Sequence, residues 1–131
     1  MSVPHKDWQW FGRAGHFICG EYCRFHLCTK VGPWLVSTIG DLVHPRNSGS
    51  SEMTERKWRM ENPDGEPIGY GRFYETMVFR ISGLCGCGCG QPAIIPKELD
   101  FRGYNNTAEA TNGHLEICEK WAATPPDGGQ Q

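Results

Sequence analysis

Three cysteines alternate with glycines in residues 84–92, LCGCGCGQP, and this stretch restricts the possible folds more than any other. Glycine at every second position lets the backbone turn tightly, so the neighbouring thiols can converge on one point. The whole chain has seven cysteines, an odd number that cannot be fully paired within one molecule. The pattern is compatible with a metal site, with disulfides, or with buried thiols that pack as small hydrophobic side chains.

The choice among these depends on the redox compartment. Residues 1–15, MSVPHKDWQWFGRAG, contain no apolar run typical of a signal peptide. The sequence also has no run of the roughly 18 apolar residues that a membrane helix needs. We therefore expect the chain in a reducing cytoplasm, where clustered cysteines bind metal more often than they form disulfides.

Length and charge give further limits. The 131 residues predict one domain at 1–124, followed by a disordered tail at 125–131. The hydrophobic content of 38% is low, so a metal ion would supplement a modest core. The net charge of −2 argues against a strongly electrostatic nucleic-acid binder, which would need a basic surface.

Three segments predict the strands of a sheet. Residues 24–31 and 34–39 are rich in β-branched and aromatic side chains, and the Gly-Pro pair between them is a turn signal, so we expect a hairpin. Residues 71–82, GRFYETMVFRIS, form the clearest strand, and because neither of its faces is purely polar we place it in the middle of the sheet. Residues 7–11, DWQWF, suit a short edge strand or a segment docked by its indoles.

A long excursion from the core is predicted at residues 44–69. It opens with HPRNSGSS, whose composition is that of a loop, and it contains one candidate helical turn at 52–60. Loops of this length are often functional or mobile.

The last element is a helix. Asn106 is the expected N-cap, with Glu109 three residues on, and two consecutive prolines end the helix at Pro125. The side chains expected on its inward face are Ala110, His114, Ile117, Cys118 and Trp121. The fold class is therefore α+β, a small and mainly antiparallel sheet with a C-terminal helix.

This helix suggests the partners of the glycine-rich cysteines. His114 and Cys118 are four residues apart and so share a helix face, while Cys87 and Cys89 flank a single glycine in the turn. Zn²⁺ commonly takes four such ligands, two from a turn and two from a helix. We predict a closed, structural zinc site at Cys87, Cys89, His114 and Cys118 that ties the turn to the helix. Cys85 is an alternative to Cys87, because a C-x3-C pair fits the usual spacing better.

A second group of candidate ligands lies near the N-terminus. It consists of His16, Cys19, Cys23, His26 and Cys28. Cys19 and Cys23 share a face only in a helix, whereas His26 and Cys28 share a face only in a strand. The group is either a second metal site or a set of buried cysteines at the edge of the sheet.

No catalytic signature accompanies these clusters. The sequence has no H-E-x-x-H, no phosphate-binding G-x-x-x-x-G-K-[ST], no dinucleotide fingerprint and no zinc-deaminase motif. We therefore expect a protein that is not an enzyme. A zinc-dependent hydrolase or nuclease-like enzyme is the alternative, with His16 or His26 beside an open metal position. A nucleic-acid-binding zinc finger is the third option, disfavoured by acidic Glu109, Glu116 and Glu119 on the zinc helix.

Four segments carry a resemblance to a known family: residues 15–40, GHFICGEYCRFHLCTKVGPWLVSTIG; 73–79, FYETMVF; 86–92, GCGCGQP; and 113–122, GHLEICEKWA. The chain resembles a family of small uncharacterised proteins encoded by bacteriophages and prophages, outside the loop at 44–69. The resemblance implies expression in the cytoplasm of a bacterial host and brings no catalytic residues. It implies an interaction protein that binds and modulates a host or defence protein.

Overall fold

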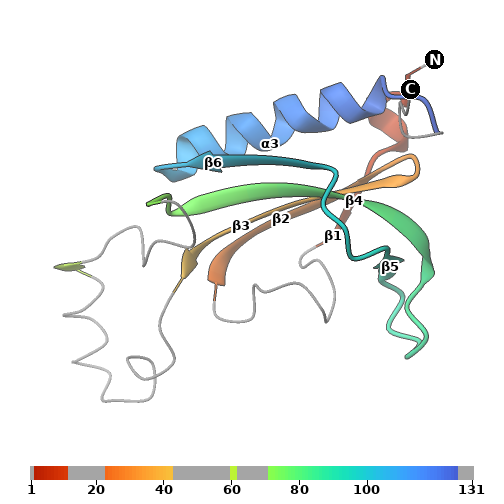
Figure 1. The fold of residues 1–131 in the computed structure, drawn as a ribbon, viewed down its shortest axis with the longest axis horizontal. Coiled ribbons are helices and arrows are strands. Elements are labelled where there is room, and N and C mark those ends of the chain that lie inside the picture. Colours follow the sequence, from red (N-terminus) through yellow and green to blue (C-terminus); the bar gives the residue numbers. More distant parts are fainter. Residues whose placement is uncertain (1, 12–22, 43–59, 62–70, 127–131) are drawn as a thin grey trace.

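The computed structural model describes residues 2–11, 23–42, 60–61 and 71–126 (Figure 1). A six-stranded sheet has the order β1-β2-β3-β4-β5, with β6 paired to β4, and every pairing is antiparallel. The elements are a short 3-10 helix at His5–Asp7, β1 (Gln9–Phe11), β2 (Cys23–Val31), β3 (Trp34–Leu42), β4 (Tyr74–Leu84), β5 (Pro92–Ile94), β6 (Asp100–Tyr104) and α3 (Thr107–Ala122). The α+β class with a mainly antiparallel sheet and a C-terminal helix is confirmed.

The predicted hairpin is confirmed as β2 and β3. Val31 pairs with Trp34 across a turn in which Gly32 has a φ of 62°, a conformation that favours glycine. The strand predicted at 71–82 is confirmed as β4, and its mid-sheet position is confirmed because it pairs with β3 on one side and with β5 and β6 on the other. The segment 7–11 supplies the short edge strand β1.

Other predictions fall on parts of the chain that the structure does not describe. These are the loop at 44–69, except for Met60 and Glu61, its helical turn at 52–60 except for Met60, and the tail from 127 on. In the described part of the chain, no helix is long and apolar enough to cross a membrane.

Helix α3 begins where the sequence predicts. The Asn106 side chain accepts a hydrogen bond of 2.8 Å from the Glu109 backbone N–H. The Glu109 carboxylate in turn accepts one from the Asn105 N–H at 3.2 Å. The Asn106 cap thus satisfies one backbone donor of the first turn, and the Glu109 side chain reaches back to the residue before the N-cap, an arrangement close to a capping box.

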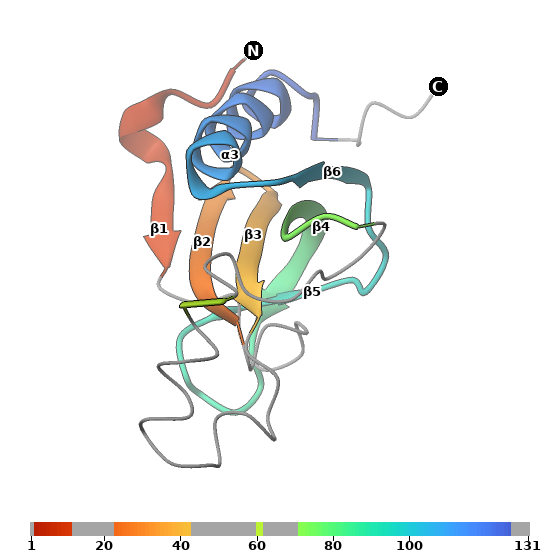
Figure 2. The same ribbon diagram turned by 90° about the vertical axis from the view of Figure 1, so that its left-hand side faces the viewer.

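The main core lies between α3 and the sheet. Figure 2 shows the helix, seen nearly end-on, above the strands. The Trp34 and Trp121 rings meet edge to face, with their centroids 4.9 Å apart. Complete burial of a large apolar side chain contributes about 1.5–3 kcal/mol to the stability of the fold. The buried members of this cluster are Val31, Trp34, Val36, Val78, Ile117, Cys118, Trp121 and Ala122.

The opposite face of the sheet supports the β4–β5 hairpin. Leu35 follows Trp34 on β3 and therefore points away from α3. Ile81 of β4 and Ile94 of β5 pack against the buried pair Cys28 and Leu35. The register of β4 and β5 shifts between Ile81 and Gly83, and the hairpin descends on the side of the sheet away from α3 (Figure 1).

Helix α3 packs tightly against the sheet at Gly113. A Cβ atom added there would lie 2.1 Å from Cε1 of the buried Tyr104.

We predict that Gly113→Ala lowers the free energy of unfolding by about 2 kcal/mol, although alanine is the better helix former, because the tyrosine must shift. Urea unfolding checks this. The control is Asn112→Ala on the exposed face, which should be neutral or slightly stabilising; a stabilising Gly113→Ala would contradict this packing.

Candidate metal centre

The loop between β4 and β5 is a compact turn. The Cys85 N–H donates to the Gln91 carbonyl at 2.8 Å, and the Gly88 N–H donates to the Cys85 carbonyl at 3.2 Å. Gly88 and Gly90 have φ values of 85° and 84°. No heavy atom lies within 4 Å of a Cβ built at either position, so the backbone conformation, and not lack of space, favours glycine there.

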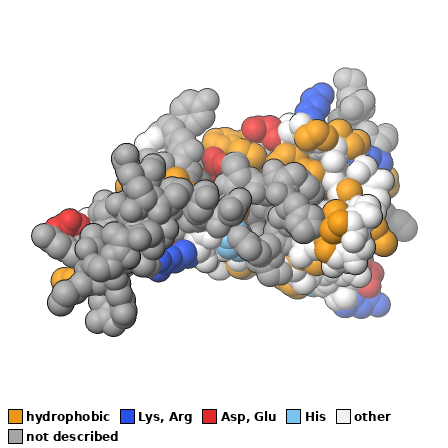
Figure 3. Space-filling view, turned by 90° about the horizontal axis from the view of Figure 1, so that it is seen from below, with side chains coloured by type: hydrophobic (Ala, Val, Ile, Leu, Met, Phe, Trp, Pro, Cys, Tyr) orange, Lys and Arg blue, Asp and Glu red, His pale blue; other side chains and the backbone are white. Residues whose placement is uncertain are grey.

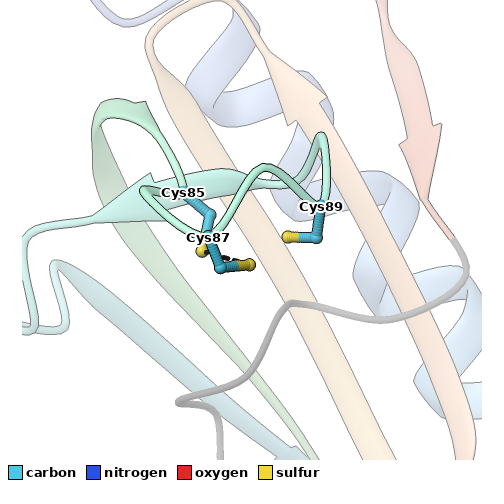
Figure 4. A group of neighbouring side chains, drawn as sticks. All are labelled: Cys85, Cys87 and Cys89. Carbon is cyan, nitrogen blue, oxygen red and sulfur yellow. Dashed lines mark hydrogen bonds between the residues drawn. The ribbon is translucent and has the colours of Figure 1, made fainter.

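This turn brings three thiols together. The sulfur atoms of Cys85, Cys87 and Cys89 all lie within 4.8 Å of one another (Figure 4). Those of Cys85 and Cys87 are 3.4 Å apart and share a hydrogen bond. Tetrahedral zinc with bonds of about 2.3 Å to sulfur sets its sulfur ligands about 3.8 Å apart. Small side-chain rotations therefore suffice for this group to hold a metal ion.

The thiols influence one another's ionisation. The pKa of Cys85 is lowered chiefly because its sulfur accepts a hydrogen bond from the backbone N–H of Cys87, and further by the side-chain hydrogen bond that it shares with Cys87. The pKa of Cys87 is raised because its proton is held in hydrogen bonds with the Cys85 and Cys89 side chains. The cluster thus gives up its first proton readily and its next proton reluctantly, and a metal ion bound by all three sulfurs would displace all three thiol protons.

His114 lies elsewhere, fully buried between α3 and the sheet. Its Nε2 is 2.8 Å from the Thr29 hydroxyl and its Nδ1 is 2.6 Å from the Thr38 hydroxyl. Burial lowers the pKa of His114 to about 4, so the ring is neutral at pH 7. A neutral imidazole has one donor and one acceptor nitrogen, and both are used by threonines, so neither is directed at a metal.

Cys118 is also fully buried, one turn further along α3. Burial raises the pKa of its thiol to about 12. The same holds for Cys28, whose pKa is raised to about 12 by burial and secondarily by the nearby Cys118. Because the thiolate is the metal ligand, both residues act here as small core side chains.

The structure therefore divides the four predicted ligands between two places. Cys87 and Cys89 meet Cys85, the residue that the spacing rule offered as an alternative, in the exposed hairpin. His114 and Cys118 share a helix face as predicted, but they lie in the core and are not part of this group. The signal for Cys85 was present in the sequence, since all three cysteines sit at alternate positions of one glycine-rich turn.

The N-terminal candidates are placed only in part. His16 and Cys19 lie outside the described residues. Cys23 and Cys28 are buried in β2, and the His26 Nε2 hydrogen-bonds the Cys23 carbonyl at 2.6 Å. Within the described part of the chain, none of these three belongs to the group of potential metal ligands.

Comparison with known proteins gives no further assignment for this site. No protein-family model matches the chain, and neither a curated protein nor a solved structure does.

The burial of neutral His114 predicts a specific acid sensitivity. Its pKa is about 4 in the fold and about 6.5 when unfolded, so the unfolded chain takes up the proton first as the pH falls. The stability held above pH 6.5 should drop by about 3 kcal/mol by pH 4. Urea unfolding at pH 7 and pH 4 measures this, with His114→Gln as the reference that lacks the titrating ring. An equal loss in both proteins would contradict the assignment.

Proposed function

We propose that the chain is a non-enzymatic binding protein whose β4–β5 hairpin is organised by one zinc ion held by Cys85, Cys87 and Cys89. The observation that carries this proposal is the convergence of three thiol sulfurs within 4.8 Å on one exposed turn. The ion would stabilise the hairpin only, since His114 and Cys118 are buried in the core and are not part of the cysteine group.

The ligand type supports zinc among the available ions. Thiolates are soft ligands, suited to Zn²⁺ and Cu⁺ and poorly suited to Mg²⁺ or Ca²⁺. Zn²⁺ has no geometric preference of its own, so it accepts the arrangement that a short glycine-rich turn provides. Three protein ligands leave a fourth position of the tetrahedron for water or another donor.

The same ligand set supports a role other than catalysis. Three thiolates carry three negative charges against the two positive charges of zinc, so the loaded centre would be a weaker Lewis acid than a zinc ion held by neutral histidines. The alternative of a zinc-dependent hydrolase places His16 or His26 beside an open metal position. The His26 Nε2 is instead hydrogen-bonded to the Cys23 carbonyl, and His16 lies outside the described residues.

The surroundings of the hairpin support protein binding. Leu84, at the end of β4, is 76% exposed, and Ile95, just after β5, is 46% exposed. Figure 3 shows the face opposite α3, where hydrophobic side chains are visible at the hairpin end of the molecule. Exposed apolar side chains are found at interaction sites, and these two lie at the two ends of the β4–β5 pairing. The resemblance to phage proteins makes a bacterial host or defence protein the partner class that we propose.

Metal content tests the site directly. We predict about one zinc per chain in the reduced, untagged protein, as expected for one preformed site. Cys87→Ala should weaken zinc binding by more than about 100-fold, since changes outside a ligand set already cost about 10–100-fold. Mass spectrometry for metals and competition with a chromophoric chelator measure both.

Cys118→Ala is the control for this measurement and should keep the zinc, because Cys118 is a core residue here. Loss of zinc in Cys118→Ala, with retention in Cys85→Ala, would contradict the hairpin site and favour a link between turn and helix.

Partner capture tests the binding surface. We predict that the zinc-loaded wild-type protein captures a partner from a bacterial lysate. Ile95→Asp should abolish this capture, because the substitution places a charge in the apolar contact. Leu115→Asp is the matched control: Leu115 is 40% exposed on α3, away from the hairpin. Equal capture by all three proteins would contradict the hairpin as the binding surface.

A further inference from the structure

One pair in the cysteine cluster, Cys85 and Cys87, has a geometry suited to disulfide formation. The sulfurs of Cys85 and Cys87 are 3.4 Å apart, on a turn closed by the hydrogen bond from the Gly88 N–H to the Cys85 carbonyl. A disulfide bond is about 2.05 Å long, so the sulfurs need to approach by about 1.4 Å, within the reach of side-chain rotation.

Exposure separates these cysteines from the other described ones. Cys87 and Cys89 are exposed and Cys85 is half-buried, whereas Cys23, Cys28 and Cys118 are buried. A soluble oxidant therefore reaches the hairpin thiols before it reaches the thiols of the core.

We propose that Cys85 and Cys87 form a reversible dithiol–disulfide pair, and that oxidation of the pair by a peroxide releases the metal ion from the hairpin. The release step rests on the function proposed above, whereas formation of the disulfide does not.

The oxidation balances with hydrogen peroxide as the two-electron acceptor. One thiolate of the pair attacks a peroxide oxygen; an S–O bond forms, the O–O bond breaks, and hydroxide leaves. The second thiolate attacks the resulting sulfenic acid; the S–S bond forms, the S–O bond breaks, and a second hydroxide leaves. Two protons from the thiols or the solvent convert the hydroxides to water. Neither sulfur of the disulfide can then bind zinc as a thiolate, and the single remaining thiolate, that of Cys89, is too few ligands to hold the ion.

The small size of the ring favours reversal. A disulfide between residues separated by a single glycine closes a very short loop, so it gains little from restricting the unfolded chain. Strained or exposed disulfides are the readily reduced ones. The Cys89 sulfur lies within 4.8 Å of both partners, so an internal thiol is in place to attack the disulfide and speed its exchange with glutathione.

Peptide mapping with zinc release tests the proposal. Trypsin cleavage after Arg80 and after Lys97 gives a peptide, residues 81–97, that contains Cys85, Cys87 and Cys89 and no other cysteine. After one equivalent of peroxide, the zinc-loaded protein should yield this peptide lighter by two hydrogen atoms, with Cys89 as its one alkylatable thiol. A chelating dye should record stoichiometric zinc release, and glutathione should restore all three thiols and zinc binding.

Two variants identify the pair. In metal-free protein, Cys89→Ser should still form the Cys85–Cys87 disulfide, whereas Cys85→Ser, which retains only Cys87 and Cys89 in the hairpin, should form a disulfide there at least tenfold more slowly. The reverse order would overturn the pairing. Sulfinic acid or a disulfide between two chains as the main product would overturn it as well.

The outcomes separate this inference from the proposed function. Zinc binding without peroxide-induced disulfide or release would overturn the inference and leave the metal site standing. A disulfide in a protein that binds no zinc would overturn the proposed function and the release step, and would confirm the redox pair alone.

Discussion

The packing of α3 on the sheet depends on a histidine that is fully buried and fully hydrogen-bonded. Each ring nitrogen of His114 has a threonine hydroxyl as partner, Thr29 on β2 and Thr38 on β3. The Thr38 hydroxyl also bonds Thr76 of β4, which bonds the Tyr104 hydroxyl of β6. One chain of polar contacts therefore connects the helix with four strands, and an unmade bond in it would cost about 1–3 kcal/mol.

The hydrogen bonds of this network determine which side chains of α3 are available as metal ligands. With His114 satisfied by threonines and Cys118 protonated in the core, the helix has no ligand to offer the hairpin. The hairpin itself lies on the other side of the sheet, where its base packs on Leu35. The candidate metal ligands and the buried core therefore lie in separate parts of the structure, and under the proposed function the cysteine turn would bind or release an ion without a change in the core contacts of α3.

The sequence predicted those elements whose signals are local. The β2–β3 hairpin has a Gly-Pro turn between β-branched runs, and α3 has its cap and a clear apolar face. Strands β5 and β6 were not predicted, because Pro92–Ile94 is too short for a periodic signal and Asp100–Tyr104 includes an acidic residue and a glycine. Their pairing with β4 is a tertiary effect.

For the candidate metal site too, the sequence predicted only what a local pattern signals. Three cysteines on one glycine-rich turn are a local pattern, and the turn does bring them together. The choice of His114 and Cys118 as partners depended on helical spacing, which is also the spacing of a core-facing stripe. Only the threonines on β2 and β3, distant in sequence, distinguish a hydrogen-bonded core histidine from a ligand.

The most direct test of this account is X-ray absorption spectroscopy at the zinc edge on the loaded, reduced protein and on Cys118→Ala. The account predicts three sulfur neighbours at about 2.3 Å in both proteins. A shell with fewer than three sulfurs, or one that loses a sulfur in Cys118→Ala, would show that the ion is not held by the three hairpin cysteines alone and would contradict the account.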